Sequence, residues 1–219
     1  MKRSFQILSG LLLGLLLVAI LARNQLDSPQ APGAMLPEVQ EEGDWNGSPF
    51  PSPRPFPEFT LLDQDGGTVT RADLLGAYQV VFFGYSHCPD VCPATLLHLT
   101  RAMTLLEQEG ERIGGVLVTV DPERDTVERL KEYMAAFHGD IIALTGGLPA
   151  IENLTEQLGV GFAKVPALDP EGPTGAYTVD HTARSFVLDS SGMIVHAFSP
   201  FVTGELMAED LLRLVREAP

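Results

Sequence analysis

Two short apolar runs, Gln79–Gly84 and Ile113–Val120, constrain the fold of this chain more than any other feature. Each has the length and character of a strand buried on both faces of a sheet. After the first run, apolar residues recur at intervals of three and four from Ala94 to Glu109, which predicts an amphipathic helix. After the second, Asp125-Thr-Val-Glu128 resembles a capping box that opens a helix through Phe137. Strands that alternate with helices predict an α/β sheet with helices on both faces.

Two hairpins flank this central pattern. Asp65-Gly66-Gly67 joins Phe59–Leu62 to Thr68–Thr70, and Asp189–Gly192 joins Ala183–Leu188 to Met193–Phe198. The remaining expected elements are a short strand at Ile141–Leu144, a helix at Pro149–Leu158, a long loop at Pro166–Tyr177 and a final helix at Gly204–Arg216.

The N-terminus predicts a membrane anchor at residues 1–23. Lys2 and Arg3 precede an uncharged run, Phe5–Ala22, and about 18 residues of helix span about 27 Å, close to the roughly 30 Å hydrocarbon core. A cleaved signal peptide is the alternative, but Ile20-Leu21-Ala22 is a poor cleavage site. The basic end predicts a cytoplasmic N-terminus, with the rest of the chain outside the cytoplasm. We expect a single-pass protein of a bacterial inner membrane with its soluble domain in the periplasm, because no long transit segment precedes the anchor.

A proline-rich, acidic segment follows the anchor, and we expect residues 24–52 to be a flexible tether without regular structure. The pattern becomes globular from about Pro53, so residues 53–219 are expected to form one domain. The formal net charge of −15 argues against nucleic acid as a partner, because phosphate binding needs clustered Lys and Arg.

The only two cysteines, Cys88 and Cys92, lie where the first buried strand ends and its helix begins. If Pro93 occupies the first helical position, Cys92 lies at or beside the N-cap, where the helix dipole favours a thiolate and lowers the pKa. A purely structural disulfide would close a very short loop and contribute only about 2 kcal/mol. Paired thiolates can exchange disulfides or chelate a soft metal such as Cu(I), and the spacing alone does not choose between them.

A copper site needs a further ligand, and the chain has five histidines. His181 lies between a loop and a strand, where a side chain can be aimed at a site, and His87 is nearly as good a candidate beside Cys88. Asp121 ends the second buried strand. It either lies near the cysteines as a hydrogen-bond partner that supports the ligands, or it forms a turn before Pro122. The other histidines are expected to be solvated, at a helix end and structural, respectively: His98, His138 and His196.

Several segments together resemble the motifs of the Sco/SenC family: Phe82–Pro93, Val120–Thr126, Asp180–His181 and Ser185–Asp189. The resemblance runs from about Pro53 to the C-terminus. It implies a thioredoxin-like fold, a central mixed sheet flanked by helices, on an N-terminal transmembrane helix. It also implies a copper site made by Cys88, Cys92 and His181, and it is this resemblance that ranks His181 above His87.

The family is associated with cytochrome c oxidase, where it delivers copper to the dinuclear copper site of subunit II or reduces the cysteines of that site. Another copper chaperone or a thiol reductant would then be a further partner. Some bacterial members resemble general thiol reductases, so a metal-independent thiol-disulfide oxidoreductase acting on extracytoplasmic cysteines is the alternative, with Cys88 and Cys92 as its redox pair. Residues 24–47, including Trp45, match nothing in the family motifs.

Overall fold

A computed structural model of the protein describes residues 45–166 and 176–217. Within these ranges no helix is both long enough and apolar enough to cross a membrane. The expected anchor at residues 1–23 and the part of the expected tether before Trp45 lie outside the described residues.

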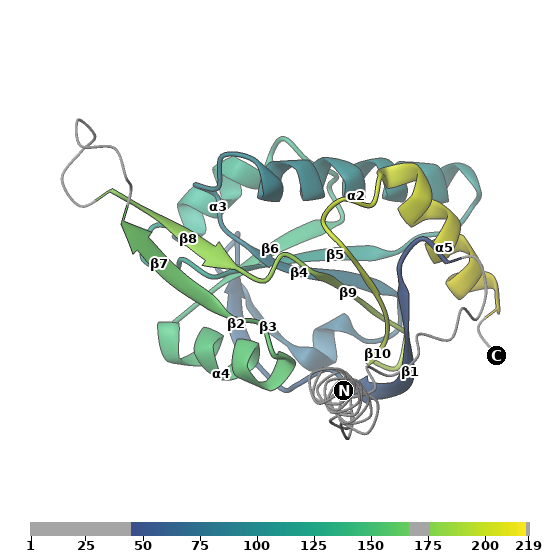
Figure 1. The fold of residues 1–219 in the computed structure, drawn as a ribbon, viewed down its shortest axis with the longest axis horizontal. Coiled ribbons are helices and arrows are strands. Elements are labelled where there is room, and N and C mark those ends of the chain that lie inside the picture. The colour runs from purple at the N-terminus through teal and green to yellow at the C-terminus, as the bar shows by residue number, and fades with distance from the viewer. Residues whose placement is uncertain (1–44, 167–175, 218–219) are drawn as a thin grey trace, which may run out of the picture. The chain divides into compact units, whose positions relative to one another are not determined.

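The domain is built on an eight-stranded mixed sheet with the order β1-β10-β9-β4-β5-β6-β2-β3 (Figure 1). Only β4, β5 and β6 pair in parallel, and the other neighbours are antiparallel. The strands of this sheet are β1 (Ser48–Pro55), β2 (Thr60–Asp63), β3 (Thr68–Thr70), β4 (Gln79–Gly84), β5 (Gly114–Thr119), β6 (Ile141–Thr145), β9 (Ser185–Leu188) and β10 (Met193–Phe198).

Helices cover both faces of the sheet, as the sequence predicts. The first face packs against α2 (Val91–Gln108), α3 (Val127–Met134) and α5 (Gly204–Glu217), and the second against α4 (Leu148–Leu158) and a short 3₁₀ helix at Arg71–Leu74. The central strand β4 serves both cores, because the side chains of a strand alternate between its faces. Val80 and Phe82 join the first core and Val81 and Phe83 the second, all at most 3% exposed. The α/β architecture and both predicted hairpins are therefore confirmed.

The start of α3 differs from the prediction. Its N-cap is Thr126, whose Oγ1 accepts a hydrogen bond from the Arg129 amide at 3.2 Å. The capping box that was expected to begin at Asp125 is therefore wrong, because the Asp125 carboxylate is buried and bonded elsewhere. The helix also ends at Met134, three residues before Phe137.

The proline-rich residues from Ser48 to Pro55 form a strand, which corrects the expectation that residues up to 52 lack regular structure. Proline is compatible with β1 because β1 is an edge strand, so one side of its backbone needs no ladder hydrogen bonds. Its antiparallel register with β10 is interrupted between Pro49 and Arg54.

A second, two-stranded sheet that the sequence did not predict is formed by β7 (Phe162–Pro166) and β8 (Tyr177–His181). The two strands are antiparallel, with Phe162 opposite His181. Figure 1 shows this ribbon on the opposite side of the domain from α5. The expected loop between the strands falls largely on residues 167–175, outside the described residues.

Residues 45–47, here called the Trp45 latch, dock on β10 and α5. The Trp45 ring lies 5.1 Å from the His196 ring, and the Arg213 guanidinium lies 4.0 Å from the Trp45 centroid. The main-chain N–H groups of Asn46 and Gly47 donate to the Asp210 carboxylate at 3.1 and 2.8 Å. His196 and Asp210, both buried, are paired at 3.0 Å, which agrees with the structural role expected for His196.

The Trp45 latch predicts a pH-dependent loss of stability in Asp210→Asn. Burial raises the pKa of Asp210, but hydrogen bonds from His196 and the latch amides outweigh burial and leave the pKa below its usual value. A depressed carboxyl pKa stabilises the fold above the unfolded-state pKa of about 3.9, and this contribution is lost as the pH falls through the folded-state pKa. We expect the variant to lose about 1–3 kcal/mol of unfolding free energy at pH 7.

Urea denaturation from pH 7 to pH 3, followed by the fluorescence of Trp45, the only tryptophan, measures this difference. The gap between the parent chain and Asp210→Asn should narrow below about pH 4. A gap that stays constant to pH 3 would contradict the assignment.

Candidate metal centre

Both cysteines lie at the junction between β4 and α2. Cys88 belongs to the turn after Gly84, and its amide donates to the Tyr85 carbonyl at 3.3 Å. Cys92 lies in the first turn of α2, and its amide points at Cys88 Sγ at 3.5 Å. Both are free thiols, Cys88 partly exposed and Cys92 only 1% exposed. The junction therefore holds one accessible and one buried sulfur on successive turns of chain.

The predicted low pKa is wrong for Cys92. Asp90 is the N-cap of α2, so Pro93 is the third helical residue rather than the first. Cys92 lies deep in the core, and burial raises the pKa of its thiol far above the usual range. Burial outweighs the helix end because a desolvated thiolate is costly in an apolar setting. Loss of the Cys92 proton is therefore costly in the metal-free domain, and a bound cation offsets that cost.

His181, the last residue of β8, meets the buried sulfur. Its Nε2 lies 3.5 Å from Cys92 Sγ, and its ring packs edge-on against Tyr85 with 5.9 Å between centroids. Burial lowers the pKa of His181, which favours the neutral imidazole that binds metals. Among the residues the structure describes, its Nδ1 is buried without a hydrogen-bond partner.

His87, the nearly equal candidate from sequence, turns away from the cysteines. Its Nδ1 lies 3.1 Å from Ser86 Oγ and 3.6 Å from Asp125 Oδ1. His138 follows α3 and lies 3.4 Å from a Glu107 carboxylate oxygen, while His98 is partly exposed on α2. Of the five histidines, His181 is thus the one that the structure brings to a cysteine.

The donors present fit a soft metal ion in their chemistry. Two sulfurs and a neutral imidazole suit copper, and the small pocket around Cys92 and His181 is lined mainly by apolar side chains, including Phe82, Phe83 and Val91. In the described ranges, however, no three His, Cys, Asp or Glu side chains already converge on one point as a metal site would require. Cys92 and His181 are in contact, with Cys88 beside the Cys92 amide. A site that uses all three remains a prediction.

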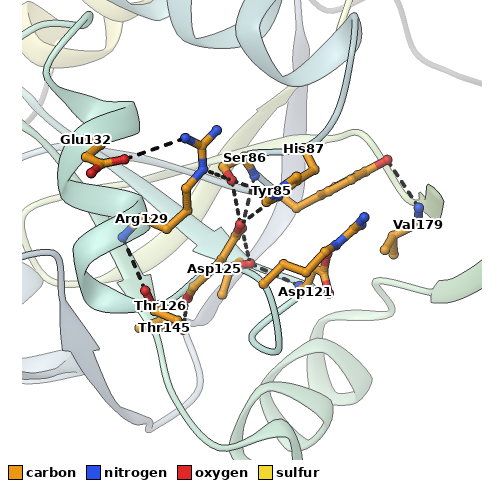
Figure 2. Close-up of polar contacts among 12 residues, drawn as sticks. Tyr85, Ser86, His87, Asp121, Asp125, Thr126, Arg129, Glu132, Thr145 and Val179 are labelled. Atoms are coloured by element: carbon orange, nitrogen blue, oxygen red, sulfur yellow. Dashed lines mark hydrogen bonds and ion pairs between the residues drawn. The ribbon is translucent and has the colours of Figure 1, made fainter. Parts of the chain in front are cut away.

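A buried carboxylate, which the sequence interpretation assigned to a helix cap, supports the cysteine turn. Asp125 is fully buried and accepts hydrogen bonds from Ser86 N and Ser86 Oγ at 3.0 and 2.6 Å (Figure 2). It also accepts one from Thr119 Oγ1 at 2.6 Å. Arg129 Nε donates to the same Ser86 hydroxyl at 3.0 Å. One sequence feature could have indicated this role of Asp125: two hydroxyl residues, Ser86 and Thr119, lie near the ends of two adjacent parallel strands.

Asp121, the other candidate carboxylate, is also fully buried but faces the β7–β8 ribbon. It accepts a hydrogen bond from the Tyr177 hydroxyl at 2.8 Å and another from Arg124 Nε. Its main-chain carbonyl accepts the amides of Arg124 and Asp125 at 3.1 and 2.9 Å, so it also forms the turn that was the simpler expectation. Its carboxylate bonds therefore connect it to the element that carries His181.

Comparison with known proteins matches this domain to one family. The SCO1/SenC family profile covers residues 52–216. A SCO2-like protein of Rickettsia prowazekii is 32% identical over 192 residues, which are 88% of this chain and 87% of the relative. The copper-bound ScoI of Bradyrhizobium japonicum is 35% identical, with 73% of this chain and 99% of that chain covered and a TM-score of 0.65. The copper-bound ScoI of Arabidopsis thaliana is 29% identical, with coverage of 75% and 100% and a TM-score of 0.69.

The close packing of Gly84 on Cys92 generates one prediction. A Cβ at residue 84 would lie 2.8 Å from Cys92 Sγ and 3.3 Å from a Leu117 methyl carbon. Gly84→Ala must displace the buried sulfur, and we expect a loss of about 1–3 kcal/mol in unfolding free energy. Urea denaturation measures it, with Gly139→Ala as the matched control, because no atom lies within 4 Å of a Cβ there. Equal stability of the two variants would contradict this packing.

The Asp125 carboxylate generates a second prediction. Asp125→Asn keeps the shape of the side chain, but an amide cannot accept all three hydrogen bonds, so a buried donor is left unpaired. We expect the free energy of unfolding to fall by about 1.5–3 kcal/mol, and amide exchange in the turn from Tyr85 to Asp90 to accelerate. Glu132→Gln is the control, because Glu132 is exposed and only 3.9 Å from Arg129 in a surface ion pair. Unchanged stability and exchange in Asp125→Asn would show that the turn is held by other contacts.

Proposed function

The chain belongs to the SCO1/SenC family, and from this premise we propose that its α/β domain binds copper through Cys88, Cys92 and His181. The observation that carries the proposal is the 3.5 Å approach of His181 Nε2 to Cys92 Sγ, between elements far apart in sequence. Copper is present in the solved structures of the two ScoI relatives. The same three residues are those that the family motifs mark in this sequence.

The donor set suits both oxidation states of copper. Two thiolates favour Cu(I), and an imidazole makes the site tolerable for Cu(II). The chain itself contributes a neutral His181 and a buried Cys92 whose proton leaves when the metal enters. The partly exposed Cys88 provides the sulfur through which copper enters or leaves by ligand exchange.

We assign the copper site a role in cytochrome c oxidase assembly, with the dinuclear copper site of subunit II as the recipient. In this proposal the domain lies outside the cytoplasm and is anchored by residues 1–23. Another copper chaperone supplies its copper, or a thiol reductant supplies electrons to its cysteines. The uncharged run at Phe5–Ala22 and the basic residues before it support this location.

A metal-independent thiol reductase is the second candidate, and the unequal exposure of the two cysteines is the observation that favours it. The partly exposed Cys88 would attack a partner's disulfide, and Cys92 would then resolve the mixed disulfide. The partner gains two thiols, and Cys88 and Cys92 are left as a disulfide. This chemistry requires no histidine.

Titration of the reduced full-length chain with Cu(I) and Cu(II) tests the copper proposal. We expect about one copper per chain, no tight binding in Cys88→Ala, and a Cu(II) affinity at least about tenfold weaker in His181→Ala. His98→Ala is the matched control, because that histidine is partly exposed on α2 and does not line the pocket around Cys92 and His181.

The reductase candidate makes the opposite prediction for the same variants. The copper-free dithiol would reduce a disulfide in a subunit II peptide, and His181→Ala would reduce it at the parent rate. If His181→Ala left Cu(II) affinity and spectrum unchanged, the ligand assignment would be wrong.

A further inference from the structure

The two halves of the proposed site belong to elements of two different sheets. Cys88 and Cys92 follow β4, in the centre of the eight-stranded sheet. His181 ends β8, which pairs only with β7 in a separate sheet. The chain brings His181 near the cysteines, because Ser185 of β9, four residues further on, pairs with Phe82 of β4. Contacts of β8 with other elements then set how closely His181 approaches Cys92.

One short turn, residues 121–125 between β5 and α3, supplies contacts to the ribbon. The Tyr177 hydroxyl donates to Asp121 Oδ1 at 2.8 Å, and an Arg124 guanidinium nitrogen donates to the Tyr177 carbonyl at 3.1 Å. The guanidinium also stacks 3.7 Å from the centroid of the Tyr177 ring and bonds to Asp121 through Nε. Asp121, Arg124 and Tyr177 thus form a closed set of contacts between the turn and the start of β8.

Burial separates these contacts from an ordinary surface pair nearby. The Asp121 side chain is fully buried and that of Arg124 is 26% exposed. Lys164 of β7 also reaches this turn through Glu123 at 2.6 Å, but both partners are well exposed, at 44% and 60%. Exposed ion pairs contribute little, whereas a buried carboxylate that loses a partner is strongly unfavourable. The contacts centred on the buried Asp121 carboxylate are therefore the ones that restrain the β7–β8 ribbon.

The same turn holds the cysteine segment from its other end. Asp125 accepts the Ser86 amide and hydroxyl, two residues before Cys88. Hydrogen bonds fix the shape of this turn, because the Asp125 amide donates to the Asp121 carbonyl at 2.9 Å, and Thr145 Oγ1 of β6 donates to the Asp125 carbonyl at 2.8 Å. A third contact crosses directly, since the Val179 amide donates to the Tyr85 hydroxyl at 3.1 Å (Figure 2).

We propose that Arg124 and Tyr177 are positioning residues that hold His181 against Cys92. The turn at residues 121–125 then acts as a brace between the β7–β8 ribbon and the turn that carries Cys88. The inference rests on the proposed copper function and specifies how the third ligand is kept in place. A looser β7–β8 ribbon weakens the binding of Cu(II), because Cu(II) binding needs His181. The binding of Cu(I) by the two thiolates is largely unchanged.

The test uses Tyr177→Phe and Arg124→Lys in the reduced full-length chain. Tyr177→Phe removes the hydroxyl and keeps the ring, and Arg124→Lys keeps the charge and removes the planar fork. We expect the Cu(II) affinity of each to fall by about tenfold or more, with an altered Cu(II) absorption spectrum, and the Cu(I) affinity to change by less than about threefold. Tyr78→Phe is the matched control, because it also deletes one hydroxyl hydrogen bond, to the Leu214 carbonyl at 3.1 Å on α5.

A double variant separates positioning from general damage. If Tyr177 acts through His181, adding Tyr177→Phe to His181→Ala lowers the Cu(II) affinity no further. Additive losses in the double variant would overturn the proposal, as would equal losses of Cu(I) and Cu(II) affinity in the single variants or unchanged Cu(II) binding in both.

A copper-free measurement keeps this proposal distinct from the copper function. Hydrogen exchange of the Val179 amide in β8 should be at least about tenfold faster in Tyr177→Phe and Arg124→Lys, with β4 and β5 unchanged. Unchanged exchange in β8 would overturn the brace. If the parent chain binds no copper, the proposed function fails, and faster exchange then supports the brace as a structural device while overturning its role in copper affinity.

Discussion

The parallel pairing of β4 with β5 is the constraint on which the candidate site depends. Its register places Gly84 opposite Thr119, so the chain leaves both strands at the same edge of the sheet. From one strand comes the turn that carries Cys88, and from the other the turn at residues 121–125. Asp125 joins the two turns because its buried carboxylate accepts hydrogen bonds from Ser86, after one strand, and from Thr119, at the end of the other.

Burial determines the chemistry that the cysteines and His181 can perform. Burial raises the pKa of Cys92 and lowers the pKa of His181, so in both cases it favours the uncharged form. Two neutral donors in contact are stable in an apolar setting, whereas an isolated thiolate is not. A cation that binds Cys92 must therefore displace its proton, as the proposed copper site requires.

The sequence predicted those features that depend on local pattern. Buried runs, helical periodicity and glycine turns identified β4, β5, α2 and both hairpins, and the family motifs singled out His181. Features that depend on tertiary contacts were missed: the strand β1, which proline would normally oppose, the β7–β8 ribbon, and the role of Asp125. The pKa of Cys92 was misjudged because helix position is visible in a sequence, whereas burial against Gly84 and Leu117 is not. His87 illustrates the same limit, because adjacency to Cys88 says nothing about where its ring points.

The central claim is that one copper ion is bound by sulfur from Cys88 and Cys92 and nitrogen from His181. X-ray absorption spectroscopy of the Cu(II)-loaded full-length chain tests it most directly, because the copper edge reports the ligand atoms themselves. The account predicts two sulfur ligands and at least one imidazole nitrogen, with the imidazole contribution reduced in His181→Ala. A copper environment that contains no sulfur, or an imidazole signal that is unchanged in His181→Ala, would contradict it.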